Sequence, residues 1–278
     1  MIELYQGDCL EVMKEIPSKS VDMILCDLPY GTTQNKWDAI IPMNDYININ
    51  DKNIEKDEFY LQQFIKRLSK KEIDKIWKEN KQEGLWNYYN RIIKDNGAIV
   101  LTSHGVFTAE LILSNKKWFK YKLVWEKSKA TNFLNAKKQP LRKHEDICVF
   151  YKKQPIYNPQ MRIGEPYNKG IRKNQLTGSY GDFKPVEVKS DGLRYPNDII
   201  YFKTAESEGK VYHSTQKPVA LCEYLIKTYT NEGDIVLDNC MGSGTTGVAC
   251  KNLNRKFIGI ELDEEYFKIA QDRINKGE

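Results

Sequence analysis

Residues 235–253 read IVLDNCMGSGTTGVACKNL, and this stretch decides the fold. The short apolar run at 235–237 predicts a strand, and residues 245–253 predict a helix. Between them, Gly242 and Gly244 let the backbone turn tightly and let a ligand approach closely. The start of the helix offers free N–H groups, and ligands of α/β sheets bind outside the carboxyl ends of strands. The loop is therefore a candidate cofactor site, with a plain structural turn as the alternative.

The next strand after this loop also ends in a carboxylate. Residues 257–260 run into Glu261, which comes 17 positions after Gly244. An acidic residue at about this distance, roughly 20 positions, accepts hydrogen bonds from ribose hydroxyls in nucleotide-binding folds. The alternative is that Glu261 belongs to a group of carboxylates favouring the start of the next helix. Both hold if Glu261 meets a ligand while Asp263 caps the helix.

A second constellation, Asp27-Leu28-Pro29-Tyr30, follows the strongly predicted strand Val21–Cys26. It lies at the same carboxyl edge of a parallel sheet. A carboxylate and a backbone carbonyl accept both hydrogens of a flat amine, and an aromatic ring stacks on the base that carries it. The alternative is a strand end followed by a simple turn.

Around these two sites the chain alternates between strands and helices. The runs are short and several are continuously apolar, as in a sheet buried on both faces. This pattern predicts a doubly wound α/β fold with helices on both faces of the sheet. Further strands are predicted at 98–102, 121–125 and 147–151, and helices at 85–94, 218–230 and 264–274.

The composition narrows the functional class. The 278 residues carry 43 Lys and Arg against 38 Asp and Glu, a net charge of +5 that permits nucleic-acid binding without showing it. No apolar run approaches the roughly 18 residues of a membrane span, and the first residues lack a signal-peptide pattern. Six scattered cysteines without a C-x-x-C pair indicate reduced thiols in a cytoplasm. The three histidines lack metal-ligand spacing, so no metal is predicted.

Two segments fit the predicted core poorly. Residues 44–84 form an insert, and 59–77 within it predict one or two amphipathic helices. Residues 152–212 are rich in aromatics and carry 11 Lys and Arg against 7 Asp and Glu. The remaining segments, 1–43, 85–151 and 213–278, make up the predicted catalytic domain.

The two constellations together resemble the paired signatures of S-adenosylmethionine-dependent DNA amino-methyltransferases. Further matching segments are Gly7-Asp8-Cys9, residues 27–38, STQKP at 214–218 and GIELD at 259–263. The Asp-Leu-Pro-Tyr motif comes first, a target-recognition region lies in the middle, and the cofactor loop comes last. This order resembles the β group, which implies a circularly permuted Rossmann-like methyltransferase sheet. Position 28 departs from the family because it is Leu where Pro is usual, but only its carbonyl is expected to act.

The resemblance also implies roles for individual residues. Asp27, Leu28, Pro29 and Tyr30 would hold the target base. Asp8 would meet the adenine end of the cofactor, Glu261 its ribose, and residues 215–218 its methionine part. The full set implied for S-adenosylmethionine is Asp8, Cys9, Asp27, Thr215, Gln216, Lys217, Pro218, Asp238, Cys240, Met241, Gly242, Ser243, Gly244, Thr245, Thr246, Glu261 and Leu262.

The implied reaction is transfer of a methyl group to an exocyclic amine of a base flipped out of double-stranded DNA. Asp at position 27 favours adenine N6, because Ser there more often accompanies cytosine N4 in the family. Cytosine N4, another planar amine or amide such as an RNA adenine or a protein glutamine, and a catalytically silent DNA binder are the alternatives. The complete set of motifs speaks against the silent binder.

The middle segment 152–212 is the expected target-recognition region. Its Arg162, Arg172, Lys173 and Arg194 are expected to contact phosphates or guanine edges, with a solvated lid as the alternative. Lys36 and Trp37 are expected along the DNA, although Trp37 equally suits a core. A homodimer and a cognate restriction endonuclease are the expected protein partners, in a prokaryotic or phage-infected cytoplasm. The recognition sequence does not follow from these residues.

Overall fold

The structure is a computed structural model that describes residues 1–31, 38–49, 52–55, 71, 75, 78, 81–171 and 186–277. Its centre is an eight-stranded sheet in the order β1-β14-β13-β2-β5-β7-β6-β12. All neighbouring pairs are parallel except those of β7, which runs antiparallel to both β5 and β6. The strands of this sheet are β1 (Ile2–Gln6), β2 (Val21–Cys26), β5 (Ile93–Ser103), β6 (Phe119–Thr131), β7 (Arg142–Phe150), β12 (Ile199–Phe202), β13 (Ile235–Asp238) and β14 (Lys256–Glu261).

The strand order shows the circular permutation. β13 and β14 come last in the chain, yet they lie between β1 and β2, which come first. The last helix, α8 (Glu264–Lys276), packs beside β1, so joining the two would restore an uninterrupted strand–helix alternation. The predicted fold class is confirmed by this topology.

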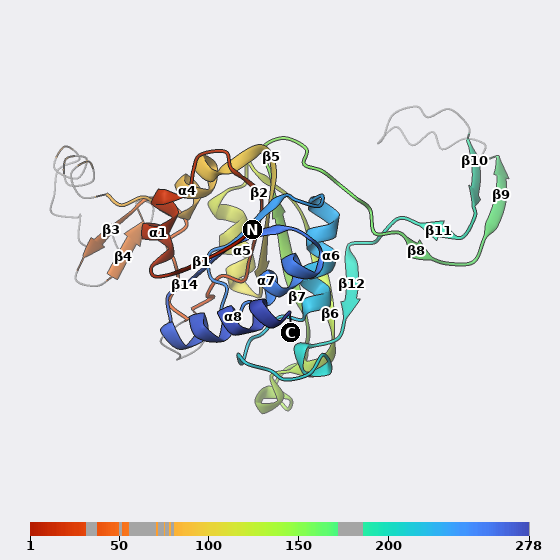
Figure 1. Ribbon diagram of the computed structural model, residues 1–278. Helices are drawn as coiled ribbons and strands as arrows, with labels where there is room; N and C mark the ends of the chain where they lie inside the picture. The colour runs from red at the N-terminus through yellow and green to blue at the C-terminus, as the bar shows by residue number, and fades with distance from the viewer. Residues whose placement is uncertain are drawn as a thin grey trace.

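Helices cover both faces of the sheet (Figure 1). One face packs against α1 (Cys9–Val12), α4 (Leu85–Ile92) and α5 (Val106–Ser114), and the other against α6 (Val219–Tyr229), α7 (Thr245–Asn252) and α8. In β2, Ile24 and Cys26 belong to the first core, and Met23 and Leu25 to the second. Burial on both faces explains why this run is continuously apolar. Short 3-10 turns occur at η1 (Met13–Glu15), η2 (Phe133–Asn135) and η3 (Ala205–Ser207).

Several predicted elements differ in extent from the observed ones. The helix predicted at 85–94 ends at Ile92, and Ile93 already begins β5. The α5 helix was not predicted; its N-cap is Gly105, at φ +60°. β6 and β7 extend well beyond the predicted apolar runs, because outside the core they pair mainly with each other as a hairpin with exposed side chains.

The insert at 44–84 contains a β-hairpin in its first part, formed by β3 (Tyr46–Ile49) and β4 (Lys52–Glu55). Residues 71, 75 and 78 are helical, with exposed side chains. The other residues of the helical stretch predicted at 59–77 lie outside the described residues, as do Lys36, Trp37, Arg172 and Lys173.

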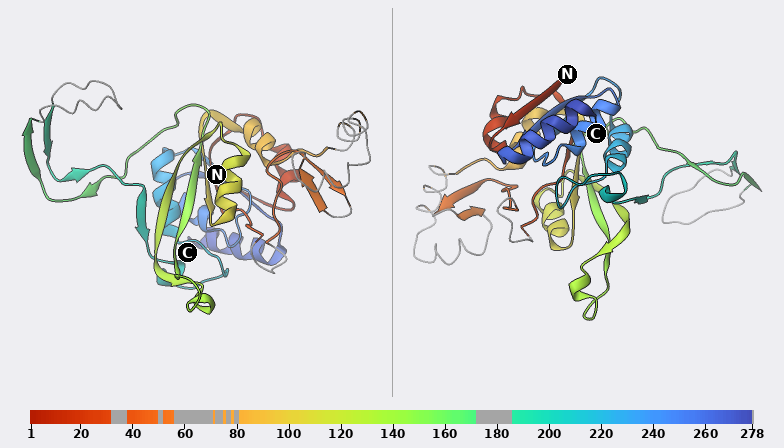
Figure 2. Two further views of the ribbon diagram at one scale, coloured as in Figure 1. Left: turned by 180° about the vertical axis from the view of Figure 1, so that it is seen from behind. Right: turned by 60° about the horizontal axis from the view of Figure 1, so that its bottom comes forward.

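The middle segment 152–212 divides into parts with different surroundings. Its first residues pack on the body, where the Asn158 side-chain Nδ2 donates to the carbonyls of Lys227 and Thr230. Its strand β12 joins the main sheet beside β6. Between them, β8 (Arg162–Ile163) pairs with β11 (Leu193–Arg194), and β9 (Tyr167–Ile171) with β10 (Glu187–Ser190). These two ribbons project away from the body, and we call residues 161–171 and 186–195 the ribbon arm (Figure 2).

None of the described helices has both the length and the apolar character that crossing a membrane requires.

Candidate functional site

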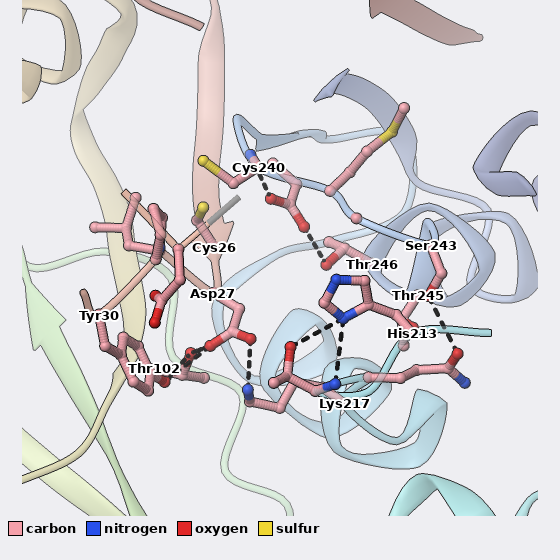
Figure 3. Close-up of a pocket in the computed structure, with 18 of the residues that line it drawn as sticks. Cys26, Asp27, Tyr30, Thr102, His213, Lys217, Cys240, Ser243, Thr245 and Thr246 are labelled. Carbon is pink, nitrogen blue, oxygen red and sulfur yellow. Dashed lines mark hydrogen bonds and ion pairs between the residues drawn. The ribbon is translucent and has the colours of Figure 1, made fainter. Parts of the chain in front are cut away.

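A cavity of about 1050 Å³ opens at the carboxyl edge of the sheet. Its walls include the residues that follow β2, β13 and β14, together with residues 213–217 before α6. Figure 3 shows Asp27, Lys217, Cys240 and Thr246 converging there from separate elements. The two constellations predicted from the sequence therefore share one cavity.

The loop after β13 packs tightly against α8 through Gly244. This glycine is the N-cap of α7 at φ +81°, a left-handed conformation that glycine adopts without strain. A Cβ at this position would lie 2.9 Å from the Cβ and 3.0 Å from the Cα of Ala270. The loop therefore needs glycine here both for its backbone conformation and for its contact with the helix.

Asp238 holds this loop from inside. Its carboxylate accepts hydrogen bonds from the Cys240 amide at 3.1 Å and the Thr246 hydroxyl at 2.6 Å. The side chain is buried, and burial raises the pKa of Asp238 to about 6. Asp238 thus fixes the first turn of the loop and carries its negative charge at neutral pH.

Glu261 and Asp263 make different contacts at the end of β14. Glu261 Oε2 accepts from the Gly242 amide at 2.8 Å and Oε1 from the Asp263 amide at 2.9 Å, so this carboxylate joins β14 to the cofactor loop at the cavity wall. Burial raises the pKa of Glu261. Asp263 caps α8 by accepting from the amides of Glu265 and Tyr266. A carboxylate has about four lone-pair sites, so Glu261 retains acceptor capacity.

Asp8 and Cys9 form another part of the wall, next to β14. Asp8 accepts from the Leu10 amide at 2.7 Å and so caps the short α1 helix. The Cys9 thiol is buried, and its hydrogen bond with Cys240, followed by burial, raises the pKa of this thiol well above its ordinary value. These thiols are protonated and serve as packing groups.

Asp27 receives hydrogen bonds from three sides. Its Oδ1 accepts from the Tyr30 hydroxyl at 2.8 Å and from the Thr102 hydroxyl, and its Oδ2 lies 2.5 Å from Lys217 Nζ. The ring of Tyr30 stacks on Phe107, with centroids 5.0 Å apart and planes 27° apart. The carboxylate and the ring are thus held in fixed orientations at the cavity wall.

Lys217 belongs to a nearly buried chain of four alternating charges. Its ammonium bridges Asp27 and Glu145, at 2.5 Å and 3.5 Å, and Glu145 in turn bonds Lys127 at 3.0 Å. Burial alone would lower the pKa of Lys217, but the charges of Asp27 and Glu145 outweigh it and raise that pKa. Burial likewise opposes ionisation of Glu145, and Lys217 and Lys127 overcome it and lower its pKa. Lys217 and Glu145 are therefore both charged at neutral pH.

Three of these partners were not predicted. Thr102 was assigned only to a strand end, although β5 is the neighbour of β2, and adjacency would place it beside Asp27. Lys127 and Glu145 lie on β6 and β7, outside the predicted apolar runs. Alternation of apolar and polar residues along β6 was the available signal, but it does not identify the neighbouring strand.

The segment before α6 connects the part of the cavity around Asp27 with the loop that follows β13. Gln216 Oε1 accepts from the Ser243 hydroxyl at 3.1 Å and from the Tyr212 amide at 3.0 Å. Arg273 of α8 donates to the Ser243 carbonyl at 2.6 Å and lies over the Tyr212 ring. Residues 212–217 are therefore tied to the cofactor loop.

Most of the residues predicted for the site line this one cavity. Pro218 and Gly244 do not: they are the N-caps of α6 and α7 and lie behind the wall. Arg162 and Arg194 lie on the ribbon arm, away from the cavity. The predicted residues in the wall are Asp8, Cys9, Asp27, Leu28, Pro29, Tyr30, Thr215, Gln216, Lys217, Asp238, Cys240, Met241, Gly242, Ser243, Thr245, Thr246, Glu261 and Leu262.

Comparison with known proteins shows that the chain is similar to DNA methyltransferases. The family model described as DNA methylase matches residues 21–272. The chain is 27% identical to the Type II methyltransferase M.HindIII of Haemophilus influenzae, covering 98% of this chain and 94% of that protein. It is 28% identical to M.BglII of Bacillus subtilis, covering 96% and 67%.

Solved structures of DNA methyltransferases share the fold of this chain. The crystal structure of the M1.HpyAVI–SAM complex superposes with a TM-score of 0.59 at 25% identity, covering 99% of this chain and all of that one. The cytosine-N4-specific PvuII DNA methyltransferase, at 15% identity, shares the fold with a TM-score of 0.60 over 100% of this chain and 93% of that one.

Proposed function

Because the chain belongs to the DNA methylase family, whose model it matches over residues 21–272, we propose that it methylates N6 of adenine at a specific duplex sequence. It is a site-specific, S-adenosylmethionine-dependent DNA methyltransferase of the N6/N4 amino-methyltransferase family. One observation carries the choice of chemistry: Asp27, a carboxylate rather than a hydroxyl, faces the cavity beside the Tyr30 ring.

The residues of the cavity fit S-adenosylmethionine. Its ribose hydroxyls, its amino groups and its positive sulfonium call for acceptors and negative charge, and the walls supply Asp8, Asp238 and Glu261. The volume of about 1050 Å³ accommodates a cofactor together with a flipped base. We assign Glu261 to the ribose, Asp8 to the adenine end and residues 215–217 to the methionine part. When bound, the cofactor supplies an electrophilic methyl group.

The chain's own contribution is to make an exocyclic amine nucleophilic. The lone pair of such an amine is delocalised into the base ring. Asp27 and the carbonyl of Leu28 accept its two hydrogens and favour tetrahedral geometry at nitrogen, which localises the lone pair. Tyr30, supported by Phe107, stacks on the base and holds it for in-line attack. Positioning of this kind supplies a large part of the rate enhancement.

Lys217 is a positioning residue in this scheme. Its ammonium holds Asp27 Oδ2 while Thr102 and Tyr30 hold Oδ1, so the carboxylate cannot rotate away from the amine. The same ammonium lies 5.9 Å from the Tyr30 ring centroid. Glu145 and Lys127 hold Lys217 in turn.

We assign sequence recognition to the segment 152–212 and, within it, to the ribbon arm. A two-stranded antiparallel ribbon has the dimensions to enter a major groove. Arg162 is exposed on the arm and donates to Asn197 at 2.7 Å, and Ile163 beside it is 93% exposed. Arg194 instead lies over Tyr167 and donates to the Glu165 carbonyl, so its first role is to hold the arm together.

The likeness to Type II methyltransferases supports a role beside a restriction endonuclease of the same specificity, in the cytoplasm of a bacterium or an infected cell. A homodimer is part of this proposal, and the β3–β4 hairpin of the insert is a candidate element for it.

The deciding experiment measures transfer from labelled S-adenosylmethionine to mixed-sequence duplex DNA, followed by digestion to nucleosides and chromatography. We expect the label in N6-methyladenine, and sequencing of the modified sites then gives the recognition rule. Label in N4-methylcytosine would keep the fold and chemistry but overturn the role given to Asp27 in base choice. Absence of label from DNA, with cofactor binding intact, would contradict the function itself.

A further inference from the structure

The hairpin of β6 and β7 extends past the edge of the sheet where the cavity opens. β6 and β5 are both antiparallel to β7, and β5 is parallel to β2, so β6 runs parallel to β2. The carboxyl end of β6 therefore lies at the same edge of the sheet as Asp27. Thr131 and Arg142, which pair across the base of the loop, line the cavity. We call residues 129–143 the finger. Figure 2 shows it projecting from the body beyond the rest of the sheet.

The tip of the finger presents two bulky apolar side chains to solvent. Phe133 is 66% exposed and Leu134 is 100% exposed. The loop around them is tightly bonded: the Asn135 amide and side chain both donate to Asn132, and the amides of Lys138 and Gln139 donate to the Asn135 carbonyl. A built turn therefore holds the two apolar residues outward, although burial against the body would be favourable.

Basic residues surround this apolar tip. The finger contains five Lys and Arg and no Asp or Glu. Lys129 and Lys143 at its base pair with Glu206 and Glu126. Among the described residues, no carboxylate pairs with the exposed Lys137, Lys138 or Arg142. A partner complementary to an apolar tip surrounded by basic residues has an apolar interior flanked on both sides by negative charge.

We propose that the finger enters duplex DNA at the target site, with Phe133 and Leu134 filling the space that the flipped base leaves. Lys137, Lys138 and Arg142 then contact the flanking phosphates. Apolar side chains inserted between base steps stabilise unstacked DNA, and a flipped base leaves one such step open. The position of Thr131 and Arg142 in the cavity wall fits this arrangement, because it places the base of the finger at the same cavity as Asp27. The proposal rests on the proposed function.

The test uses the full chain with Phe133→Ala and Leu134→Ala combined, at a site already mapped with wild-type enzyme. Two duplexes are compared, one with the target base paired and one with the target opposite an abasic position, where flipping is easier. On the paired duplex we expect kcat/KM to fall at least about tenfold, and on the abasic duplex by no more than about twofold. Leu113→Ala is the matched control, because Leu113 is an exposed leucine on α5, and it should leave both rates unchanged.

Equal losses on the two duplexes, or no loss on either, would overturn the proposal. Sedimentation of the wild type and the double variant tests whether the tip binds a second copy of the chain instead. If a wild-type dimer becomes a monomer in the variant and both duplexes lose rate equally, the tip is an interface between copies. Failure of the proposed function is a separate result, because wild-type enzyme would then leave N6 of adenine unlabelled in any duplex.

Discussion

The cavity and the ribbon arm differ in how their polar side chains are partnered. In the cavity, Asp27, Lys217, Glu145 and Lys127 form one alternating chain of charges with mostly buried side chains. On the arm, Arg162 and Ile163 are exposed, and the paired strands have only two to five residues each. The body therefore carries a prearranged chemical site, whereas the arm presents exposed side chains, which we propose contact DNA. Substitutions in the two regions should therefore affect different steps.

The largest effect is expected from Asp27→Ala. Removal of the acceptor for the amine should lower kcat by about three orders of magnitude or more, since a positioned proton acceptor contributes about 10²–10⁴-fold. The measurement is label transfer to duplex DNA, with cofactor affinity from calorimetry. Affinity for S-adenosylmethionine should change little, and retained methyl transfer in this variant would remove the mechanism.

A buried carboxylate of the cavity should also make stability depend on pH. Because burial raises the pKa of Asp238 to about 6, the folded protein binds this proton more tightly than the unfolded chain. The free energy of unfolding of the wild type then falls relative to that of Asp238→Asn as the pH rises from about 4 to about 6. The expected loss is about 3 kcal/mol, because each unit of pKa shift corresponds to about 1.36 kcal/mol. Chemical unfolding of both proteins at several pH values measures this difference. A difference that stays constant with pH would contradict the assignment.

Shortening the arm should separate DNA recognition from cofactor binding. The Gly164 amide donates to the Gly192 carbonyl at 2.8 Å, so an Asn-Gly turn between these residues can replace 165–191. We expect DNA methylation to fall by about 100-fold, because specific base contacts are worth about 1–3 kcal/mol each. The melting temperature and cofactor affinity should be close to wild type. A loss of cofactor affinity in this variant would break the division between the two regions.

Two glycines with nearly the same φ test the packing of the loop after β13. Gly244 and Gly233 have φ of +81° and +83°, but a Cβ would meet Ala270 only at Gly244 and has open space at Gly233. Gly244→Ala should therefore destabilise the protein by about 2 kcal/mol more than Gly233→Ala, as expected for overpacking. Denaturant unfolding gives both values. Equal losses would mean that backbone strain alone sets the cost.

The smallest effect is expected for Lys217→Met. Loss of the ammonium leaves Asp27 without one of its three holders, so kcat should fall about tenfold, the scale of a hydrogen bond to a charged group. The acid limb of the pH–rate profile should move to higher pH. Lys217→Arg, which keeps the charge, should recover part of the rate. An unchanged pH profile in Lys217→Met would show that the residue acts only in folding.

The sequence predicted the sheet and both halves of the cavity because their signals are local. Strand ends followed by Asp27, Asp238 and Glu261 are visible in short windows, and the permuted order was implied by the family resemblance of the motif order. Glu145 and Lys127 were missed because their importance depends on pairing between β6 and β7. The ribbon arm was predicted only as a basic, aromatic segment, since its strands are too short to leave a periodic pattern.

The permuted strand order also sets when the enzyme becomes active during its own synthesis. Ile2 of β1 pairs with Phe257 of β14, and β2 takes β13 as a neighbour. On a ribosome adding about 5–20 residues per second, the first strand waits roughly 13–50 s for that partner. Until then the nascent chain holds the residues for the target base without the loop for the methyl donor. Catalytic competence therefore arrives only with strands β13 and β14, and nascent chains interrupted before them cannot methylate DNA.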